Sequence, residues 1–404
     1  MAETLEHLVV DGNEVLEIKL VRSADDIEDE QTTFGPEMCH QVFGENENIF
    51  GYTDLQIKLY YSAASLQTYL GISYSDKIDP KKTGGLKADD IEEALKKVLA
   101  PGYVTNLDVF VSMLEKDKNF TPHGKLIHTF STIPCDGCES RTFEVYYSEV
   151  TTPGFLSFHE RIQTFLLWYV DGASFINVDD DQWTFFTVFE KCRNSVGEYR
   201  YSVAAYTTVF RYYAYPNNVR PRVSQVLTLP PFRKMGICAN LLQAIYSHFI
   251  AQPEVVDITV EDPSESFQRI RDFVDVKNCE SLPAFQPLKL LQGFSPEMIN
   301  QARSKFKINK KQARRVYEIL RLKNTNTSDK TAYLTYRLDV KNRLNAPFQK
   351  KKLELKKLQK FLKPEEFIAS ANASGAAETH ARLAAHYRAL EDEYRAVLHR
   401  LELQ

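Results

Sequence analysis

The 404-residue chain lacks several features, and each absence excludes a class of protein. No run of about 18 apolar residues occurs, so we expect neither a membrane-spanning helix nor a membrane partner. The start, Met1 to His7, is acidic and lacks the basic and apolar regions of a secretory signal peptide. The six cysteines are scattered along the chain, which predicts reduced thiols and an intracellular protein.

A metal site is also not expected. Cys135 and Cys138 have the CxxC spacing of zinc ligands, but no second pair and no adjacent histidine accompanies them. Because a structural zinc ion takes four protein ligands, one such pair is insufficient. The sequence therefore predicts no metal cofactor.

Charge is distributed unevenly, although the net charge is only −4. Residues 1–50 contain 13 acidic and 2 basic residues, whereas residues 301–360 contain 19 basic and 4 acidic ones. A protein that is basic throughout and reads nucleic acid by sequence is excluded, since the acidic end would repel phosphate. The acidic end could attract a cationic partner, and the alternative is that both regions are solvated faces.

The order of strand-like and helix-like segments predicts an α+β fold. Alternating residues at 15–20 and 55–60 indicate half-buried antiparallel strands, and 88–99 is helix-like. Residues 155–170 indicate a buried helix. After it we expect strands at 183–191 and 199–212 joined by the turn Asn194 to Gly197, a strand at 222–229, a helix at 239–250, a strand at 254–260 and a helix at 264–276.

Beyond residue 285 the pattern is helical. Residues 312–322 are amphipathic, and Pro364 precedes two glutamates, as at the start of a helix. In the last segment, 381–403, apolar residues recur every three or four positions and form one stripe on a terminal helix. That stripe could pack on its own domain or bind a partner.

The segment most informative about chemistry is the loop Arg233-Lys234-Met235-Gly236-Ile237-Cys238-Ala239, between an expected strand and an expected helix. The start of a helix has unpaired backbone N–H groups and a partial positive charge, so it can bind phosphate without any side chain. Gly236 permits a close approach of the backbone to an anion. An ordinary strand–helix connection is the alternative reading of this loop.

The loop resembles the pyrophosphate loop of GNAT-type acyltransferases, with the spacing Q/R-x-x-G-x-G/A. Further motifs resemble the catalytic subunit of type B histone acetyltransferases, in the same order and at similar spacing over residues 10–345. These motifs are Phe50-Gly51-Tyr52, Asp179-Asp180-Asp181-Gln182-Trp183, Arg220-Pro221-Arg222-Val223-Ser224-Gln225, Asp257 to Ser264, Phe306-Lys307-Ile308-Asn309-Lys310 and Ala313-Arg314-Arg315-Val316-Tyr317. The family usually has glycine at the positions of Lys234 and Cys238. The property that this difference would change is the affinity for the cofactor.

The resemblance implies a GNAT-type acetyltransferase domain with an amino-terminal α/β domain and a small helical carboxy-terminal domain. The expected boundaries are 1–135 for the amino-terminal substrate-side domain, 136–278 for the acetyltransferase domain, 279–345 for the helical domain, and 346–404 for a basic linker and terminal helix.

The resemblance also implies the site residues, beginning with acetyl-CoA as co-substrate. Val226, Leu227 and Thr228 would bind its pantetheine arm through backbone groups. Arg233, Lys234, Met235, Gly236, Ile237, Cys238 and Ala239 would hold the pyrophosphate, and Ser266 would contact the cofactor. The histone tail would contact Asn46, Glu47 and Asn48, together with Trp183, Phe210, Arg211 and Tyr212. The alternative for the aromatic residues is that they are ordinary sheet residues, some in the core and some on the surface.

Acyl transfer to lysine requires a base, because the ammonium, with a pKa of about 10.4, must lose a proton first. The resemblance places this base at Glu261, with Asp262 and Asp171 as nearby acids. The alternative role of the Glu-Asp-Pro-Ser sequence is to cap the next helix, and Asp262 is the main candidate for that cap. The family tends to have glutamate at the position of Asp171.

The implied substrate is lysine in the tail of newly synthesised histone four, together with histone three. The implied partner is a WD-repeat histone chaperone, in nucleus and cytoplasm. Two other functions stay open, namely a non-catalytic histone-binding module and a GNAT-type enzyme for another amine.

Overall fold

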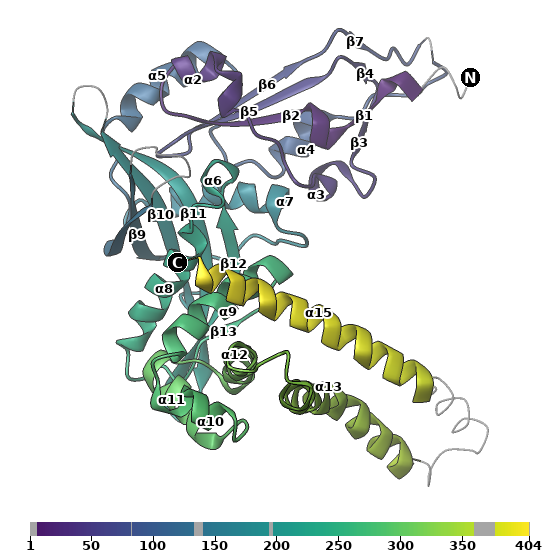
Figure 1. The fold of residues 1–404 in the computed structure, drawn as a ribbon. Helices are drawn as coiled ribbons and strands as arrows, with labels where there is room; N and C mark the ends of the chain where they lie inside the picture. The colour runs from purple at the N-terminus through teal and green to yellow at the C-terminus, as the bar shows by residue number, and fades with distance from the viewer. Residues whose placement is uncertain (1–5, 82, 133–139, 194–196, 359–375, 404) are drawn as a thin grey trace. The chain divides into compact units, whose positions relative to one another are not determined.

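The computed structural model describes residues 6–81, 83–132, 140–193, 197–358 and 376–403. The chain forms two compact units, Met1–Ala251 and Gln252–Gln404 (Figure 1). This division falls inside the segment 136–278, for which the sequence predicted one domain, and the four predicted boundaries stay a prediction. Cys135, Cys138 and the Pro364 segment lie outside the described residues.

The first unit begins with a three-stranded sheet in the order β2-β5-β6 (Leu16–Val21, Gln56–Ser62 and Thr68–Ser73). The predicted strands at 15–20 and 55–60 are present, but antiparallel pairing was wrong: β2 and β5 run parallel, while β5 and β6 run antiparallel. The connection between Val21 and Gln56 exceeds the roughly dozen residues that a parallel crossover needs. Five of the six β2 residues are buried, as is typical of a parallel strand covered on both faces.

Short elements surround this sheet. Helix α5 (Leu107–Asp117) packs Phe110 and Leu114 against Val21 and Tyr60. The predicted helix near 88–99 is α4 (Ile91–Lys96), and the Asp90 side chain caps it by accepting from Glu93 N. The remaining elements are α1 (Gly12–Val15), α2 (Asp25–Glu28), α3 (His40–Phe43), β1 (Val9–Asp11) paired with β3 (Asn48–Phe50), and β4 (Tyr52–Thr53) paired with β7 (Asp76–Lys77).

Gly51 explains the Phe50-Gly51-Tyr52 motif. Its φ is +99°, a left-handed conformation that side chains rarely adopt. A Cβ at this position would lie 2.6 Å from Ala88 Cα, so a larger residue would also collide with backbone. Gly51 therefore allows its segment to lie close to the segment that contains Ala88.

The larger sheet of the first unit has the strand order β12-β11-β10-β9-β8, all antiparallel. Its strands are β8 (Lys125–Thr132), β9 (Arg141–Glu149), β10 (Trp183–Arg193), β11 (Tyr199–Ala214) and β12 (Asn218–Thr228). The predicted hairpin is confirmed, since β10 pairs with β11 up to Arg193 opposite Tyr199. Asn194 to Val196 of its turn lie outside the described residues.

Helices cover both faces of this sheet. The predicted buried segment 155–170 forms α6 (Phe155–Ile162), a 3-10 turn and α7 (Leu166–Tyr169). On one face, Phe155 of α6 packs 4.9 Å from the Phe185 ring. On the other face, Phe249 of α8 (Ile237–Ile250) packs 5.9 Å from the Phe186 ring. Neighbouring strand residues point to opposite faces, so α6 and α8 enclose the sheet.

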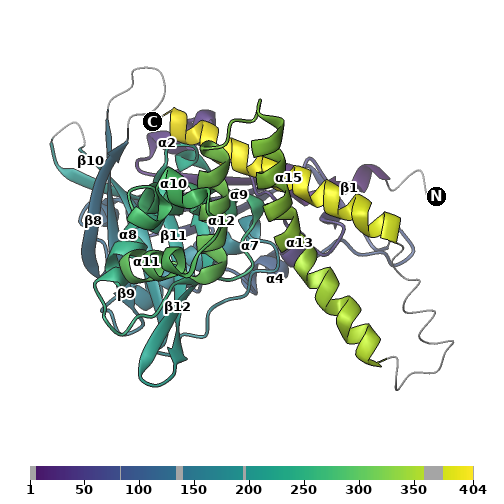
Figure 2. The ribbon, with the colours of Figure 1, turned by 60° about the horizontal axis from the view of Figure 1, so that its bottom comes forward.

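The second unit is mainly helical, as the sequence predicted beyond residue 285. It contains α9 (Glu265–Cys279), α10 (Pro287–Leu290), α11 (Pro296–Phe306), α12 (Lys310–Lys323), α13 (Lys330–Leu358) and α15 (Ala376–Glu402). Figure 2 shows α15 running alongside α9, α12 and α13. The predicted apolar stripe is confirmed, with Tyr387, Leu390, Tyr394 and Val397 buried. The stripe therefore packs within its own unit, which was the first of the two alternatives, and the other was binding of a partner.

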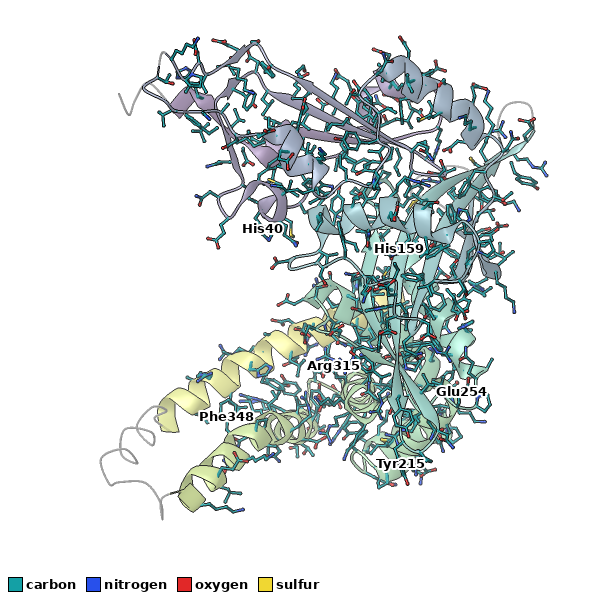
Figure 3. All side chains as sticks on the ribbon, turned by 180° about the vertical axis from the view of Figure 1, so that it is seen from behind. His40, His159, Tyr215, Glu254, Arg315 and Phe348 are labelled. Carbon is teal, nitrogen blue, oxygen red and sulfur yellow. The ribbon has the colours of Figure 1, made fainter. Side chains whose placement is uncertain are left out.

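Buried ion pairs join these helices. Asp272 of α9 is fully buried and accepts from Gln268, Gln312 and Arg315, with Arg315 Nη2 at 2.7 Å. The Arg315 guanidinium also lies 3.1 Å from Glu393 of α15, so it links three helices (Figure 3). Each buried charge thus has a partner, and removal of either member would leave the other without one.

The predicted strand 254–260 is only partly correct, because β13 comprises Thr259–Val260 alone. Ile258 N donates to Lys307 O at 2.7 Å, and Ile258 O accepts from the side chains of Arg271 and Asn309. Lys307 Nζ donates to Val255 O. These long-range bonds replace a strand ladder over residues 255–258. Among the described residues, no helix is both long and apolar enough to span a bilayer.

Candidate active site

The loop 233–239 connects β12 to α8 as predicted. Gly236 is the N-cap of α8 with φ +77°, and within the described chain no side chain caps this helix end. A Cβ at Gly236 would have Asn240 Nδ2 as its nearest contact at 3.8 Å, so the space around this residue is open. The start of α8 therefore combines the partial positive charge of a helix N-terminus with open space beside Gly236, which suits a phosphate.

Lys234 and Cys238 stand where the resemblance to the family leads us to expect glycine. Lys234 has φ +63°, a conformation that costs a side-chain-bearing residue roughly 1–2 kcal/mol. Its side chain is exposed, while Cys238 is half-buried in the first turn of α8. The backbone at position 234 therefore has a conformation that glycine would adopt without this cost.

Arg233, the first residue of the loop, contacts residues outside it. Its Nε donates to Thr228 O at 3.1 Å, and its guanidinium forms an ion pair with Glu37 and lies 5.3 Å from the Tyr169 ring. These contacts fix the side chain of Arg233 at the start of the loop. Arg233 thus supports the loop, and its contact with the pyrophosphate stays a prediction.

Arg141 is a residue beside the loop that the sequence did not reveal. It lies at the start of β9, and its Nη1 donates to Met235 Sδ at 3.5 Å. Its guanidinium lies 5.2 Å from the Phe232 ring and pairs with Glu190, which also binds Arg22. No local motif marks Arg141, because its partners are about 50 and 90 residues away in sequence.

The predicted pantetheine residues lie at the end of β12. Thr228 is opposite Ala205, Leu227 opposite Tyr206, and Val226 opposite Thr207 of β11. Leu227 is buried, whereas Val226 and Thr228 are half-buried. A bulge follows between Thr207 and Val209. In an antiparallel strand, the N–H groups of alternate residues point to the same side. Some N–H groups of β12 therefore bond to β11, and those between them point away from β11.

Glu47 of the predicted substrate segment has an internal role. Its Oε1 accepts from the N–H groups of Cys39 at 2.7 Å and His40 at 3.0 Å, and its Oε2 accepts from Asn13. These bonds, that of Cys39 foremost, lower the pKa of the Glu47 carboxyl. Asn46 and Asn48 flank it in the chain and are exposed.

His40 brings Glu47 close to Asp171, one of the predicted catalytic acids. Its ring nitrogens lie 3.6 Å from Glu47 Oε1 and 3.2 Å from Asp171 Oδ1. Gln41 Nε2 donates to Ala173 O at 2.8 Å, so helix α3 is tied twice to the segment that carries Asp171. Figure 3 shows His40 on this helix. The structure thus joins a predicted substrate residue and a predicted catalytic residue that are far apart in sequence.

Three of the predicted aromatic contacts form one ladder on the α6 face of the sheet. Trp183 and Phe210 pair across β10 and β11 with ring centroids 4.9 Å apart, and Tyr212 lies 4.6 Å from Phe210. The Arg222 guanidinium lies 4.6 Å from the Tyr212 ring. Arg211 is on the opposite face, because neighbouring strand residues alternate. The structure therefore does not bring Arg211 together with the other three side chains.

The predicted base Glu261 and the adjacent Asp262 belong to the second unit, whereas Asp171 belongs to the first. Glu261 follows β13 directly and is exposed, and Asp262 has φ +29°. The helix cap proposed for Asp262 was wrong: Ser264 is the N-cap of α9, and its Oγ accepts from Phe267 N at 3.2 Å. Ser266 Oγ lies 3.0 Å from Ser264 Oγ.

Comparisons with known proteins give consistent results. The family model described as the HAT1 N-terminus of histone acetyl transferase matches residues 8–171. The model described as the C-terminal part of the histone acetyltransferase type B catalytic subunit matches residues 271–322.

Full-length relatives carry the same name. The histone acetyltransferase type B catalytic subunit of Homo sapiens is 46% identical over 389 residues, which cover 96% of this chain and 92% of the human protein. That of Mus musculus is also 46% identical, over 96% and 93% of the two chains. The protein of Cryptococcus neoformans var. neoformans is 31% identical over 85% of this chain and 90% of its own. The chain therefore belongs to the family of type B histone acetyltransferase catalytic subunits.

Proposed function

We propose that this protein transfers the acetyl group of acetyl-CoA to a lysine side chain in the tail of newly synthesised histone four. The observation that carries the proposal is the 46% identity over 96% of the chain to a protein named histone acetyltransferase type B catalytic subunit. The uncapped start of α8 behind Gly236 supports it, since it offers amides to a phosphate.

The cofactor residues divide into two groups. The amides from Gly236 to Ala239 hold the pyrophosphate of acetyl-CoA, and Lys234 adds a positive charge nearby. The backbone of Val226, Leu227 and Thr228 pairs with the pantetheine arm, and one of these N–H groups polarises the thioester carbonyl. Ser266 supplies a further contact through its hydroxyl.

The chemistry is a direct attack of the lysine amine on the thioester carbon. Glu261 accepts a proton from the lysine ammonium, whose ordinary pKa of about 10.4 keeps it charged at neutral pH. The new C–N bond forms while the C–S bond breaks, and CoA leaves as the thiol or thiolate. Asp171 and Asp262 add negative charge that attracts the lysine. The transfer is direct, without an acyl-enzyme, and Cys238 is not a nucleophile because it belongs to the phosphate-binding segment and not to the thioester site.

The substrate surface combines acidic and aromatic groups. Trp183, Phe210 and Tyr212 offer ring faces to a Lys- and Gly-rich peptide, and Asp171 offers a carboxylate that is 82% exposed. Asn46, Glu47 and Asn48 border it. The substrate is histone four before its assembly into chromatin, together with histone three. A WD-repeat histone chaperone presents it, in nucleus and cytoplasm.

An acetyl-transfer assay tests the proposal. The full chain is incubated with acetyl-CoA and either the histone four tail peptide or a matched peptide in which each lysine is arginine. We expect acetylation of the first peptide alone. Transfer to the amino terminus of the arginine peptide, or to a polyamine but not to the tail, would instead indicate an enzyme for another amine.

The departures at Lys234 and Cys238 favour one alternative, a histone-binding module without activity. Calorimetric titration with acetyl-CoA separates the two, because the module would bind the histone tail but not the cofactor. Binding of acetyl-CoA without transfer to any histone peptide, with or without the chaperone, would contradict the proposed substrate.

A further inference from the structure

The carboxy-terminal end of α13 takes no part in the proposed acetyl transfer. The buried residues of this helix, Tyr336, Val340 and Leu344, are four positions apart and form the face that packs against its neighbours. Phe348 follows one turn later and lies 5.9 Å from the Arg382 guanidinium of α15. In Figures 1 and 2 the turns after Phe348 extend away from the other helices of the second unit. Packing within this unit therefore accounts for the helix as far as Phe348.

After Phe348, the residues of α13 are exposed wherever the structure describes their side chains. The side chain of Lys350 is 80% exposed, and Leu353 and Glu354 are 59% exposed. Lys357 is exposed as well. Lys350 Nζ lies 4.0 Å from the Glu354 carboxylate, and an exposed ion pair of this length is weak. This end of the helix is therefore accessible to a partner.

The exposed end is strongly basic. Residues 349–358 contain five lysines and one glutamate, a net charge of +4. The helix dipole favours cations in the last turn, which accounts for the two lysines nearest the end but not for Lys350, Lys351 and Lys352. Lys352 and Lys356 are also four positions apart, where like charges destabilise a helix. The charge therefore indicates an anionic partner and not a support of the helix itself.

The composition of residues 349–358 favours phosphate over a protein surface. Protein–protein interfaces are enriched in arginine and aromatic residues and depleted of lysine, whereas this segment contains neither arginine nor an aromatic residue. Lysine is a compact point charge on a flexible stem, and it contacts phosphate without a fixed geometry. Apart from Gln349, the segment also lacks the side chains that read base edges. It therefore suits a phosphate backbone and not a base sequence.

The helical form of the segment matches one kind of duplex. Successive positions on an α-helix are about 100° apart, so Lys350, Lys351 and Lys352 occupy positions on different sides of α13. Ten helical residues extend over about 15 Å, and a helix with its side chains is about 10–12 Å wide. The major groove of B-DNA is about 12 Å wide, whereas that of an RNA duplex is deep and narrow. Charges on several sides of one helix therefore fit between the phosphates that border the major groove of DNA.

We propose that the end of α13, residues 349–358, docks in the major groove of double-stranded DNA and contacts its phosphates without reading the sequence. This contact uses none of the residues proposed for acetyl transfer. DNA would therefore hold the enzyme through a separate surface while the active site stays accessible to a histone.

Fluorescence anisotropy of the full chain with a labelled DNA duplex of mixed sequence tests the proposal at several salt concentrations. We expect a Kd of about 10⁻⁴ to 10⁻⁶ M at physiological salt and a slope of log affinity against log salt of about −4.5, since five lysines are involved. A variant with glutamine at Lys350, Lys351, Lys352, Lys356 and Lys357 retains good helix formers. It should bind at least about 10-fold more weakly at low salt, with a slope of about zero.

The matched control changes the net charge equally outside the segment. It carries glutamine at five other exposed lysines of the second unit, Lys289, Lys305, Lys310, Lys311 and Lys330. It should keep most of the affinity and the full slope. Lys350→Gln and Lys357→Gln, which should each reduce the slope by about one, keep the test valid should the fivefold variant lose its helix.

Three results would overturn the proposal. The first is an unmodified chain that does not bind DNA, and the second is an equal loss in the control and the fivefold variant. The third is a partner of another class: binding to an RNA duplex of the same sequence, to polyglutamate or to anionic lipid vesicles that is as tight as binding to DNA. Circular dichroism checks that each variant keeps its helices.

Discussion

The Nε2 atom of His40 lies 3.2 Å from Oδ1 of Asp171, and the other ring nitrogen faces the carboxylate of Glu47. This contact connects the helix after Cys39 with the segment after Tyr169, which the chain separates by about 130 residues. Tyr169 OH strengthens the same connection by donating to Gly35 O at 2.8 Å. The position of Asp171 therefore depends on residues of the amino-terminal region, not on its own loop alone.

The first prediction separates support of the fold from substrate binding. Trp183→Ala should raise the KM for histone peptide, because it removes one ring of the half-buried ladder, while acetyl-CoA affinity changes little. Glu47→Ala should lower the melting temperature, because three internal donors lose their acceptor. Steady-state kinetics and thermal unfolding of both variants check this. A melting temperature of Glu47→Ala equal to that of the unmodified protein would mean that these bonds do not support the fold.

The second prediction concerns the base. Glu261→Gln keeps the shape but cannot accept a proton, and general-base assistance typically contributes about 100- to 10,000-fold. We expect turnover at pH 7 to fall within that range and to recover as the pH rises toward the pKa of lysine, with cofactor affinity preserved. Asp262→Asn should cost less, and Asp171→Asn should fall between them.

His40→Gln serves as the control for the position of Asp171. Since the exposed His40–Asp171 contact is worth up to about 1 kcal/mol, its loss should reduce kcat/KM no more than about fivefold. A nearly active Glu261→Gln beside an inactive Asp171→Asn would move the base to Asp171.

The third prediction concerns the phosphate loop. Gly236→Glu should abolish CoA binding through bulk and negative charge; its left-handed backbone, with φ +77°, should cost roughly 1–2 kcal/mol of stability, while the open space around it avoids a collision. Cys238→Gly, which restores the residue of the family, should leave affinity equal or better. Calorimetry with CoA measures both, and unchanged affinity in Gly236→Glu would sink the assignment of this loop.

Lys234 allows charge and conformation to be separated in the same loop. Lys234→Gly should raise the free energy of unfolding by up to about 1 kcal/mol, because glycine relieves the left-handed backbone at some entropic cost. Lys234→Ala removes the charge but keeps the conformation. A loss of CoA affinity in both variants would assign that loss to the ammonium group.

The fourth prediction is a pH dependence of stability. His159 of α6 is fully buried against Phe155 and Phe185, and burial lowers its pKa from 6.5 to about 4. Between these two values the unfolded chain binds the proton and the folded chain does not, so stability falls as the pH drops from 6.5 to 4. The contribution is about 3 kcal/mol at most.

Denaturant unfolding at several pH values measures this effect. His159→Leu should reduce the slope of stability against pH in that window, whereas His7→Gln, at an exposed position, should leave it unchanged. Burial also lowers the pKa of His123 and His248, so part of the slope should persist in the variant. An identical slope with and without His159 would contradict the prediction.

Local patterns were sufficient for the elements whose hydrogen bonds are local. The aromatic and β-branched runs of β10 and β11 predicted a hairpin, and the stripe from Tyr387 to Val397 predicted a packed helix face. The direction of the strands could not be predicted from local patterns. The alternation of apolar and polar residues in β2 and β5 is compatible with parallel and with antiparallel pairing. The bonds that replace a ladder at Ile258 come from Lys307, Arg271 and Asn309, which no window around residue 258 contains.

The candidate site shows the same limit. Gly236 could be interpreted from the sequence, since a positive φ is a local requirement, whereas the cap of α9 was assigned to Asp262 and lies at Ser264. His40 and Arg141 could not, because each acts on a segment 90 or more residues away. The internal bonds of Glu47 were likewise hidden, since its partners Asn13 and Cys39 precede it without any spacing rule.

The position of α15 bears on how the chain folds during synthesis. Arg315 and Glu318 lie in α12, yet they contact Glu393 and Tyr394 of α15, which follow 78 and 76 residues later in the chain. Because a chain is synthesised from its amino-terminal side, the first unit can fold before either helix is made, whereas the charged groups of α12 must wait for α15. A chain that stops before α15 would therefore have a complete first unit and a second unit whose buried charges lack these partners.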